Sequence, residues 1–411
     1  MGRESDAMDS PTVTNWDGVI IGGGIIGLTL ARAWLQREPG LKICILEKEA
    51  NSTTHGTGRN SGVVHSGIYY GEHSLRARLC VAGAERMRSF AAEKGLWIDP
   101  CGKLLIPPTE TALGSVTTLL DRGRTNGVEI ECVDGQTMRE LEPRANVQFD
   151  RALFIPTTAV VDPKAVAGAV LDDVKQLGAT VCYGSEVLAV NAQNGEVNTS
   201  TETYSCGRIF NVAGLHADRV ARRAGLQFRY SFQPFKGKYW KHRDPAFQMQ
   251  RLVYPIPDLN LPFLGVHSAH NARGEVYFGP SSTPVIGREN YQGLDGIDWR
   301  DGVALSAALV WKLLRNTNGL RTLAMREAKL LRLEGVCAEI SRLITGVQAT
   351  DLQQSVAKVG IRSQIFDPKA QSLVNDFVVV EEARVVHVLN AISPAFTASF
   401  AFADYLLDQY R

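Results

Sequence analysis

Residues 18–47 read GVIIGGGIIGLTLARAWLQREPGLKICILE: an apolar run, a glycine-rich turn, a helical pattern and a second apolar run. The turn at 22–27 matches G-x-G-x-x-G. That pattern is weak alone, but here it follows a predicted strand and opens a predicted helix over 25–37. The two apolar runs resemble parallel strands buried on both faces. This stretch therefore predicts a βαβ unit that binds a dinucleotide.

Each glycine of the turn meets a different physical demand. Gly22 allows the tight turn, Gly24 lets the backbone approach a pyrophosphate, and Gly27 lets helix and strand pack closely. The helix starting at Ile25 and Ile26 then offers free N–H groups and a partial positive charge to the phosphates.

The acidic residue Glu47 and the segment after it suggest which dinucleotide is bound. Glu47 ends the second strand about 20 residues after Gly27, where an acidic side chain hydrogen-bonds a ribose hydroxyl. The segment 53–62 is small, polar and glycine-rich, which suits close wrapping around a bulky cofactor. A nicotinamide dehydrogenase normally continues there with another helix and strand, so FAD is favoured. The residues expected to contact FAD here are Lys48, Thr57, Gly58, Arg59, Asn60, Ser61 and Gly62.

The composition is that of a globular protein with two domains. The chain has 411 residues, 45% of them hydrophobic, and a net charge of +1, which argues against nucleic-acid binding. It has no apolar run of the roughly 18 residues that a membrane span needs. Its seven scattered cysteines contain no C-x-x-C pair, which predicts neither a metal site nor disulfides and favours the cytoplasm. Peripheral contact with the inner membrane stays open.

The fold class expected is α/β: a Rossmann-like FAD-binding domain with an inserted, strand-rich α+β substrate domain. The FAD-binding domain is predicted over 15–90, 150–228 and 350–411, and the substrate domain over 91–149 and 229–349. Residues 1–16 are interpreted as a disordered leader. Further helices are predicted over 75–94, 166–177 and 398–410, and strands over 232–240, 252–256 and 276–278. Residues 100–150 are expected to hold short strands and one helix.

Residues 59–70, RNSGVVHSGIYY, resemble the signature of L-2-hydroxyglutarate dehydrogenases and oxidases, FAD enzymes of the D-amino-acid-oxidase-like superfamily. Further matches, which extend the resemblance over residues 17–405, include CGKL at 101–104, PFLGVH at 262–267, GIRSQ at 360–364 and NAISPA at 390–395. The resemblance implies a glutathione-reductase-like fold and FAD. It also implies oxidation of a 2-hydroxy acid, foremost L-2-hydroxyglutarate to 2-oxoglutarate, by hydride transfer from Cα to flavin N5.

Three catalytic roles follow from that chemistry: an anchor for the substrate carboxylate, a base for the hydroxyl proton, and donors near flavin N1 and O2. Arg362 is the predicted anchor, because a guanidinium matches a carboxylate with two hydrogen bonds. His65 is the predicted base and His267 the second choice. Lys236 and Lys238 flank a glycine on one strand face, which indicates either a pocket for a second carboxylate or a solvated edge strand.

The remaining site residues are expected from the superfamily layout. Tyr70 and Tyr254, with Tyr69, Arg59 and Arg288, either shape the substrate pocket or simply pack. The backbone predicted to contact FAD comprises Val187, Ala213, Gly214, Gly360, Pro394, Ala395, Phe396 and Thr397, the last four at a helix start facing flavin O2. The chain departs from the family at Lys236–Lys238, Ser281, 287–291 and Phe396.

Two other functions remain open at this stage. One is an FAD-dependent amine or amino-acid oxidase of the glycine- or sarcosine-oxidase kind, acting on a 2-amino acid. The other is a non-catalytic flavin-binding partner protein. The electron acceptor (oxygen, a quinone or an electron-transfer flavoprotein), the oligomeric state and covalent flavin attachment are likewise open.

Overall fold

The structure, a computed structural model, describes residues 13–257, 264–297, 299–317 and 320–410. The first twelve residues of the expected leader, and Pro262 and Phe263 of the family match, lie outside this part. The predicted βαβ unit is confirmed as β1 (Val13–Ile21), α1 (Ile25–Arg37) and β2 (Ile43–Leu46), with β1 and β2 parallel. The leader prediction is wrong for residues 13–16, because they pair with residues 203–206 and so extend β1.

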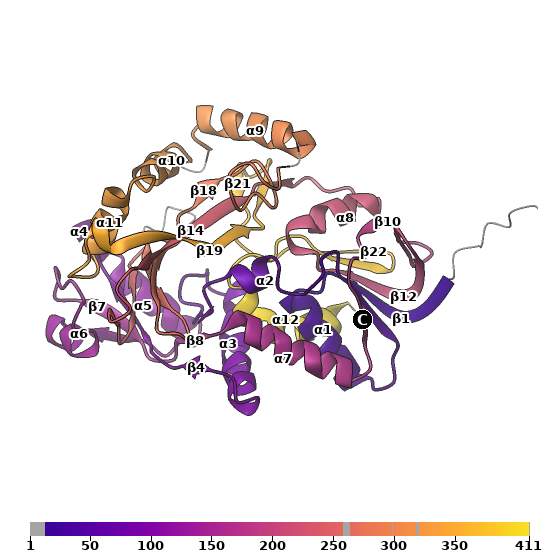
Figure 1. The fold of residues 1–411 in the computed structure, drawn as a ribbon, viewed down its shortest axis with the longest axis horizontal. Coiled ribbons are helices and arrows are strands. Elements are labelled where there is room, and N and C mark those ends of the chain that lie inside the picture. The colour runs from indigo at the N-terminus through magenta and orange to yellow at the C-terminus, as the bar shows by residue number, and fades with distance from the viewer. Residues whose placement is uncertain (1–12, 258–263, 298, 318–319, 411) are drawn as a thin grey trace, which may run out of the picture.

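The main sheet has eight strands, and Figure 1 labels four of them: β1, β10, β12 and β22. Its parallel core runs β9 (Thr180–Cys182), β2, β1, β12 (Thr203–Asn211) and β23 (Val385–Val388). The antiparallel strands β10 (Val187–Asn191), β11 (Glu196–Thr199) and β22 (Val379–Glu382) complete it. Strands from distant parts of the chain therefore build one nucleotide-binding sheet.

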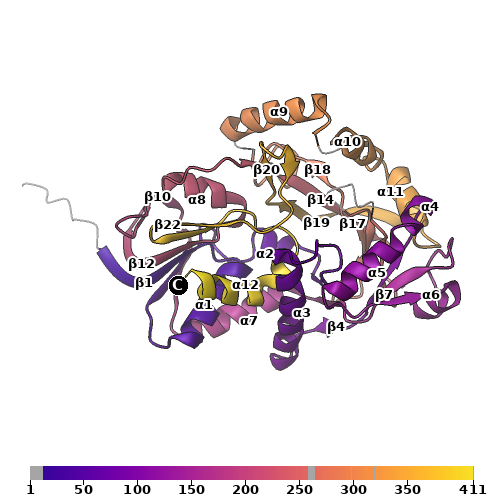
Figure 2. The same ribbon diagram turned by 180° about the vertical axis from the view of Figure 1, so that it is seen from behind.

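Helices cover both faces of this sheet. On one face α1 packs against α7 (Pro163–Gln176) and α12 (Ala395–Gln409), and α12 also packs along α3 (Leu75–Glu93), as Figure 2 shows. Gly83 permits that last contact, since a Cβ there would lie 2.5 Å from the Thr397 carbonyl oxygen. The short α8 (Ala217–Arg223) lies on the other side of the sheet. Helix α12 begins three residues earlier than predicted.

The second part of the molecule is built on two further sheets. One has the order β15 (Leu252–Pro255), β5 (Lys103–Ile106), β7 (Ala152–Ile155) and β6 (Glu131–Val133). The other has the order β16 (His267–His270), β17 (Val276–Gly279), β14 (Phe235–His242) and β18 (Thr283–Pro284), with β19 (Leu352–Arg362) paired to β14. The strand-rich character predicted for this part is confirmed.

Short elements complete the described chain. The helices are α2 (Gly56–Arg59), α4 (Glu110–Leu113), α5 (Val116–Thr125), α6 (Gly135–Leu141), α9 (Trp299–Leu314), α10 (Leu320–Lys329) and α11 (Leu333–Ser341). The strands are β3 (Val63–Val64), β4 (Ile98–Asp99), β8 (Ala159–Val161), β13 (Ser231–Phe232), β20 (Ile365–Asp367) and β21 (Ser372–Leu373). Three helices, rather than the one expected, lie between residues 100 and 150.

The α/β fold class with a strand-rich insertion is confirmed, while the domain boundaries stay predictions. Sheet membership differs from them at two places. β7 pairs with β5 and β6, and β19 pairs with β14, although both strands fall in segments predicted for the FAD-binding domain. None of the helices in the described part of the chain is long and apolar enough to cross a membrane.

Candidate active site

A cavity of about 660 Å³ lies where the glycine-rich turn, α12 and the second part of the molecule meet. Most residues predicted to contact the cofactor line it: Gly22, Gly24, Ile25, Ile26, Glu47, Lys48, Thr57, Arg59, Asn60, Ser61, Val187, Ala213, Gly214, Gly360, Pro394, Ala395, Phe396 and Thr397. Gly27, Gly58 and Gly62 do not line it. Their hydrogens face backbone oxygens, to which a Cβ would come within 2.0, 2.0 and 2.3 Å, so they shape the loops instead.

The turn at Gly22 has the geometry expected for a pyrophosphate cradle. Gly22 has a φ of +113°, which L side chains rarely adopt, and α1 begins immediately after Gly24. The Glu47 carboxylate accepts the Gly23 N–H at 2.9 Å and the Glu49 N–H at 2.9 Å. Those two bonds fix the buried acid at the end of β2, on the cavity wall.

Replacing Gly27 by alanine is expected to weaken FAD binding about 10- to 100-fold. The new Cβ would lie 2.0 Å from the Gly22 carbonyl oxygen, and overpacking of this kind costs about 1–3 kcal/mol. Fluorescence titration of the apoprotein with FAD measures the change. Gly168→Ala in α7 is the matched control, because nothing lies within 4 Å of a Cβ there. Equal affinities of the two variants would contradict the expectation.

The wrapping loop predicted at 53–62 is held by its own hydrogen bonds. Thr57 Oγ1 accepts the Ile25 N–H at 3.0 Å, and Asn60 Oδ1 accepts the Gly62 N–H at 2.8 Å. Arg59 donates to the Thr54 carbonyl at 2.7 Å and stacks over the Tyr291 ring at 3.9 Å. The loop thereby forms one wall of the cavity beside the N-terminus of α1.

A charged cluster beside this wall was not expected from the sequence. Glu289 accepts from Lys48 Nζ at 2.7 Å and hydrogen-bonds His216 Nε2 at 2.8 Å. These partners hold the pKa of the Glu289 carboxyl below its usual range, despite its burial. Arg288, a predicted substrate partner, instead donates to Asp218 at 3.0 Å and lies outside the cavity lining. Of the two alternatives left open for Arg288, its position therefore fits packing and not the substrate pocket.

The predicted catalytic residues Arg362, His65 and His267 all line the same cavity. Arg362, at the end of β19, donates to Ser282 Oγ at 2.8 Å. The Ser282 N–H in turn donates to buried Glu327 at 2.6 Å, so a short chain of bonds orients the guanidinium. Burial lowers the pKa of Arg362, but an arginine remains charged.

Both histidines are neutral imidazoles. Burial lowers the pKa of His65 to about 3, with the charge of Lys103 acting in the same direction. Burial also lowers the pKa of His267 to about 3. His267 Nδ1 lies 2.8 Å from the Gly265 carbonyl oxygen, which requires N–H at Nδ1 and leaves Nε2 as the acceptor. The His65 backbone N–H donates to Thr397 Oγ1 at 3.1 Å, which places this histidine beside the start of α12.

The structure does not bring Lys236 and Lys238 to the cavity. Gly237 and Tyr239 line it, and because strand residues alternate, the two lysines point to the other face of β14. Lys236 Nζ donates to Asn290 Oδ1 at 3.1 Å. The predicted shared face is right, but the predicted electropositive pocket for a second carboxylate is wrong.

The predicted tyrosines take different positions. Tyr70 lines the cavity. The guanidinium carbon of Arg76 lies over the Tyr70 ring, 4.2 Å from the ring centre. Tyr254 lies outside the lining, fully buried, and stacks on His267 with ring centres 3.8 Å apart. Sequence reasoning missed Tyr239, Arg76 and Arg122 on the cavity wall. The alternation along β14 was the signal for Tyr239.

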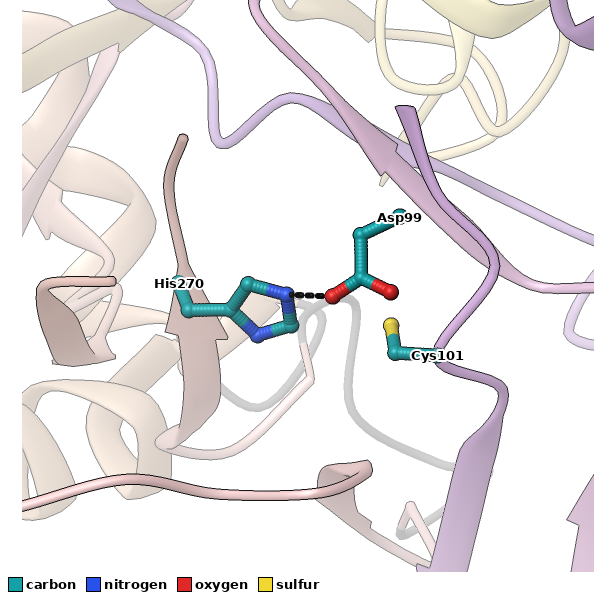
Figure 3. Close-up of side chains that lie close together, drawn as sticks. All are labelled: Asp99, Cys101 and His270. Atoms are coloured by element: carbon teal, nitrogen blue, oxygen red, sulfur yellow. Dashed lines mark hydrogen bonds and ion pairs between the residues drawn. The ribbon is translucent and has the colours of Figure 1, made fainter. Parts of the chain in front are cut away.

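Of two groups of potential metal ligands in the described chain, Glu49, His55 and Glu289 belong to the charged region beside the cavity wall, and the other group lies outside the cavity lining. Asp99, Cys101 and His270 each place a polar atom within 4.8 Å of the others (Figure 3). The Asp99 carboxylate and His270 Nε2 form a hydrogen bond of 2.7 Å. Burial raises the pKa of the Cys101 thiol to about 12. Ordinary hydrogen bonding and burial account for this group, and the absence of a metal stays a prediction.

These features define a flavoenzyme, because a glycine-rich turn, a fixed acid at the end of β2 and a helix N-terminus line one cavity that suits FAD. The chain belongs to the DAO family of FAD dependent oxidoreductases, whose model matches residues 17–409. It is an FAD-dependent oxidoreductase.

Known proteins resemble the chain over nearly its whole length. It is 31% identical to an L-2-hydroxyglutarate dehydrogenase of Escherichia coli (strain K12), covering 96% of this chain and 93% of that protein. Its fold matches FAD-bound L-alpha-glycerophosphate oxidase from Mycoplasma pneumoniae with a TM-score of 0.76 and 19% identity, over 97% and 96% of the two chains. Glycine oxidase from Geobacillus kaustophilus has a TM-score of 0.69 and 15% identity, over 96% and 94%.

Proposed function

We propose that the protein oxidises L-2-hydroxyglutarate to 2-oxoglutarate. The observation that supports this most is that Arg362 and the two neutral histidines His65 and His267 lie on the wall of the same cavity. Arg362 binds the carboxylate next to the reacting carbon through its guanidinium fork. His65 takes the hydroxyl proton at a ring nitrogen, with His267 as the alternative acceptor. Bound FAD supplies the hydride acceptor, flavin N5.

Other parts of the cavity wall support the same chemistry. Pro394–Thr397 present the N-terminus of the 15-residue helix α12, whose partial positive charge would favour negative charge on a bound flavin. This arrangement favours a 2-hydroxy acid, since a neutral amine substrate needs no base.

A dicarboxylate needs a second cationic group, and we propose Arg122 of α5 for that role in place of the two lysines. Arg122 lines the cavity and donates to the Tyr69 carbonyl at a long 3.4 Å, so its remaining donors suit a carboxylate. Arg76 lines the same region, but it already donates to the Asn375 carbonyl at 2.6 Å and stacks on Tyr70.

Anaerobic mixing of the FAD-loaded protein with a substrate panel tests the function. L-2-Hydroxyglutarate is expected to bleach the flavin absorbance, whereas D-2-hydroxyglutarate, glycine and sarcosine are not. Bleaching by the amines would replace the proposal with an amine oxidase. No bleaching by any compound would favour a flavin-binding partner protein.

Arg122→Ala is expected to raise the apparent Kd for L-2-hydroxyglutarate about 10- to 100-fold, because a charge-assisted contact contributes about 1.5–3 kcal/mol. Its effect on L-2-hydroxybutyrate, which lacks the distal carboxylate, is expected to stay within about twofold. Equal weakening for both substrates would show that Arg122 does not read the second carboxylate.

Cytoplasmic location, peripheral membrane contact and the electron acceptor remain proposals beyond this chemistry. The electron acceptor is identified by mixing the reduced enzyme with oxygen, a soluble quinone or an electron-transfer flavoprotein and comparing the rates of flavin reoxidation. The fastest reoxidation identifies the acceptor class.

A further inference from the structure

Lys103 is the first residue of β5, and its side chain is completely buried. Its Nζ has no hydrogen-bond partner among the described residues. An isolated ammonium group inside a protein is destabilising unless it is paired, and buried polar groups are nearly always hydrogen-bonded. The position of Lys103 therefore requires a reason other than stability.

The ammonium group lies next to the cavity wall, against the rings of two tyrosines. Its Nζ is 5.0 Å from the centre of the Tyr69 ring and 5.1 Å from that of Tyr254, so two aromatic faces hold it. Tyr69 lines the cavity, and Tyr254 stacks on His267. One layer of side chains thus separates Lys103 from the groups that face the substrate.

The charge of Lys103 acts on both candidate bases. It is the largest charge that lowers the pKa of His65, and it lowers the pKa of His267 together with Arg362. Burial also lowers the pKa of Lys103 itself, to about 8. A lysine with this pKa changes charge near the working pH, whereas an exposed lysine does not.

The other titratable groups around Lys103 keep their charge over the same range. The two histidines have pKa values of about 3. Burial raises the pKa of the Cys80 and Cys101 thiols to about 12, and raises the pKa of both tyrosines. Arg76 adds a permanent positive charge near His65. Lys103 is therefore the variable charge among these neighbours.

We propose that Lys103 is a positioning residue whose ammonium charge sets both the basicity of the catalytic histidine and the hold on the anionic substrate. The inference rests on the proposed function, and it applies whichever histidine is the base. The charged form attracts the carboxylates and opposes a second positive charge on the imidazole. The neutral form does the reverse, so proton transfer becomes easier while binding weakens.

Stopped-flow reduction of the FAD-loaded protein by L-2-hydroxyglutarate, from about pH 6 to about pH 10, tests this. In the wild-type protein the limiting rate is expected to rise about three- to tenfold with pH as Lys103 loses its proton, while the apparent Kd rises. Lys103→Met should give a fast, pH-independent limiting rate with weak binding. Lys103→Arg should give a slow, pH-independent rate with tight binding, because arginine stays charged.

Lys312→Met is the matched control. Lys312 is another buried lysine, its pKa is also lowered by burial to about 8, and it donates to Gln233 at 3.0 Å outside the cavity. This variant is expected to keep the wild-type pH profile. If it flattens the profile as Lys103→Met does, or if Lys103→Met keeps the wild-type rise, the inference is overturned.

Urea unfolding supplies a readout that does not involve catalysis. Since burial lowers the folded-state pKa of Lys103, the charged form destabilises the fold below about pH 8, and this penalty fades as pH rises towards the ordinary value of 10.5. Lys103→Met should therefore unfold at a higher urea concentration than wild type at pH 7, by a margin that narrows at pH 9.5. A lower midpoint for Lys103→Met would contradict the buried, unpaired ammonium group.

The two proposals fail in different ways. If no 2-hydroxy acid bleaches the flavin of the wild-type protein, the proposed function fails, whereas the urea result still reports on Lys103. If the flavin is bleached but the three Lys103 forms share one pH profile, the function stands and the role of Lys103 is wrong.

Discussion

Arg362→Ala is expected to raise the apparent Kd for L-2-hydroxyglutarate about 10²- to 10³-fold while FAD stays bound. Removing one partner of a buried, hydrogen-bonded charge pair costs roughly 2–5 kcal/mol, and the carboxylate is left without its fork. Ser282 and Glu327 hold the guanidinium in place before substrate arrives, so little of that energy is lost in ordering the side chain. Flavin bleaching against substrate concentration measures the apparent Kd.

Two variants sharpen the Arg362 prediction. Arg362→Lys keeps the charge but loses the planar fork, and about a tenfold loss of affinity is expected. Lys238→Met removes a positive charge from the opposite face of β14, outside the cavity, and should leave the affinity within about twofold. An unchanged Kd for Arg362→Ala, or an equal loss for Lys238→Met, would remove Arg362 from the anchor role.

Local signals in the sequence selected many of the residues that line the cavity beside the glycine-rich turn. The glycine turn, α1 and the loop after Glu47 are contiguous, and their geometry follows from nearby residues such as Gly22 with its positive φ. The resemblance at 59–70 then predicted the family that the comparisons confirm. Twenty-two of the twenty-eight predicted site residues line the cavity; those of the turn and the loop follow from local motifs, and the others follow from the family resemblance.

The substrate half depended on long-range pairing that the sequence does not display. Which face of β14 meets the cavity is set by its pairing with β19 and β18, so Lys236 and Lys238 were assigned to the wrong side. In the sequence, Lys103 is a charged residue at the start of an apolar run, a position typical of an exposed residue at the end of a strand. Lys103 is buried because β5 lies between β15 and β7, where Lys103 pairs with Leu252 and Ile155. Arg122 was missed because α5 was not predicted.

His65→Gln is expected to slow flavin reduction by L-2-hydroxyglutarate about 10²-fold or more, because general-base catalysis contributes about 10²- to 10⁴-fold. Glutamine keeps a polar side chain of similar reach but cannot accept the hydroxyl proton. The apparent Kd should change little, since Arg362 still binds the carboxylate. Stopped-flow measurement of the limiting rate separates this loss from a loss of binding.

His267→Gln and His270→Gln complete the comparison. All three histidines are at least half-buried, but His270 pairs with Asp99 outside the cavity lining, and its variant should keep the limiting rate within about twofold. A loss below about threefold in His65→Gln, with a large loss in His267→Gln, would move the base to His267. His267 is equipped for that role by its fixed tautomer, with Nδ1 bonded to Gly265 and Nε2 left as the acceptor. Large losses in both variants would mean that both imidazoles contribute to the reaction, each kept neutral mainly by burial, with the charges of Lys103 and Arg362 acting in the same direction.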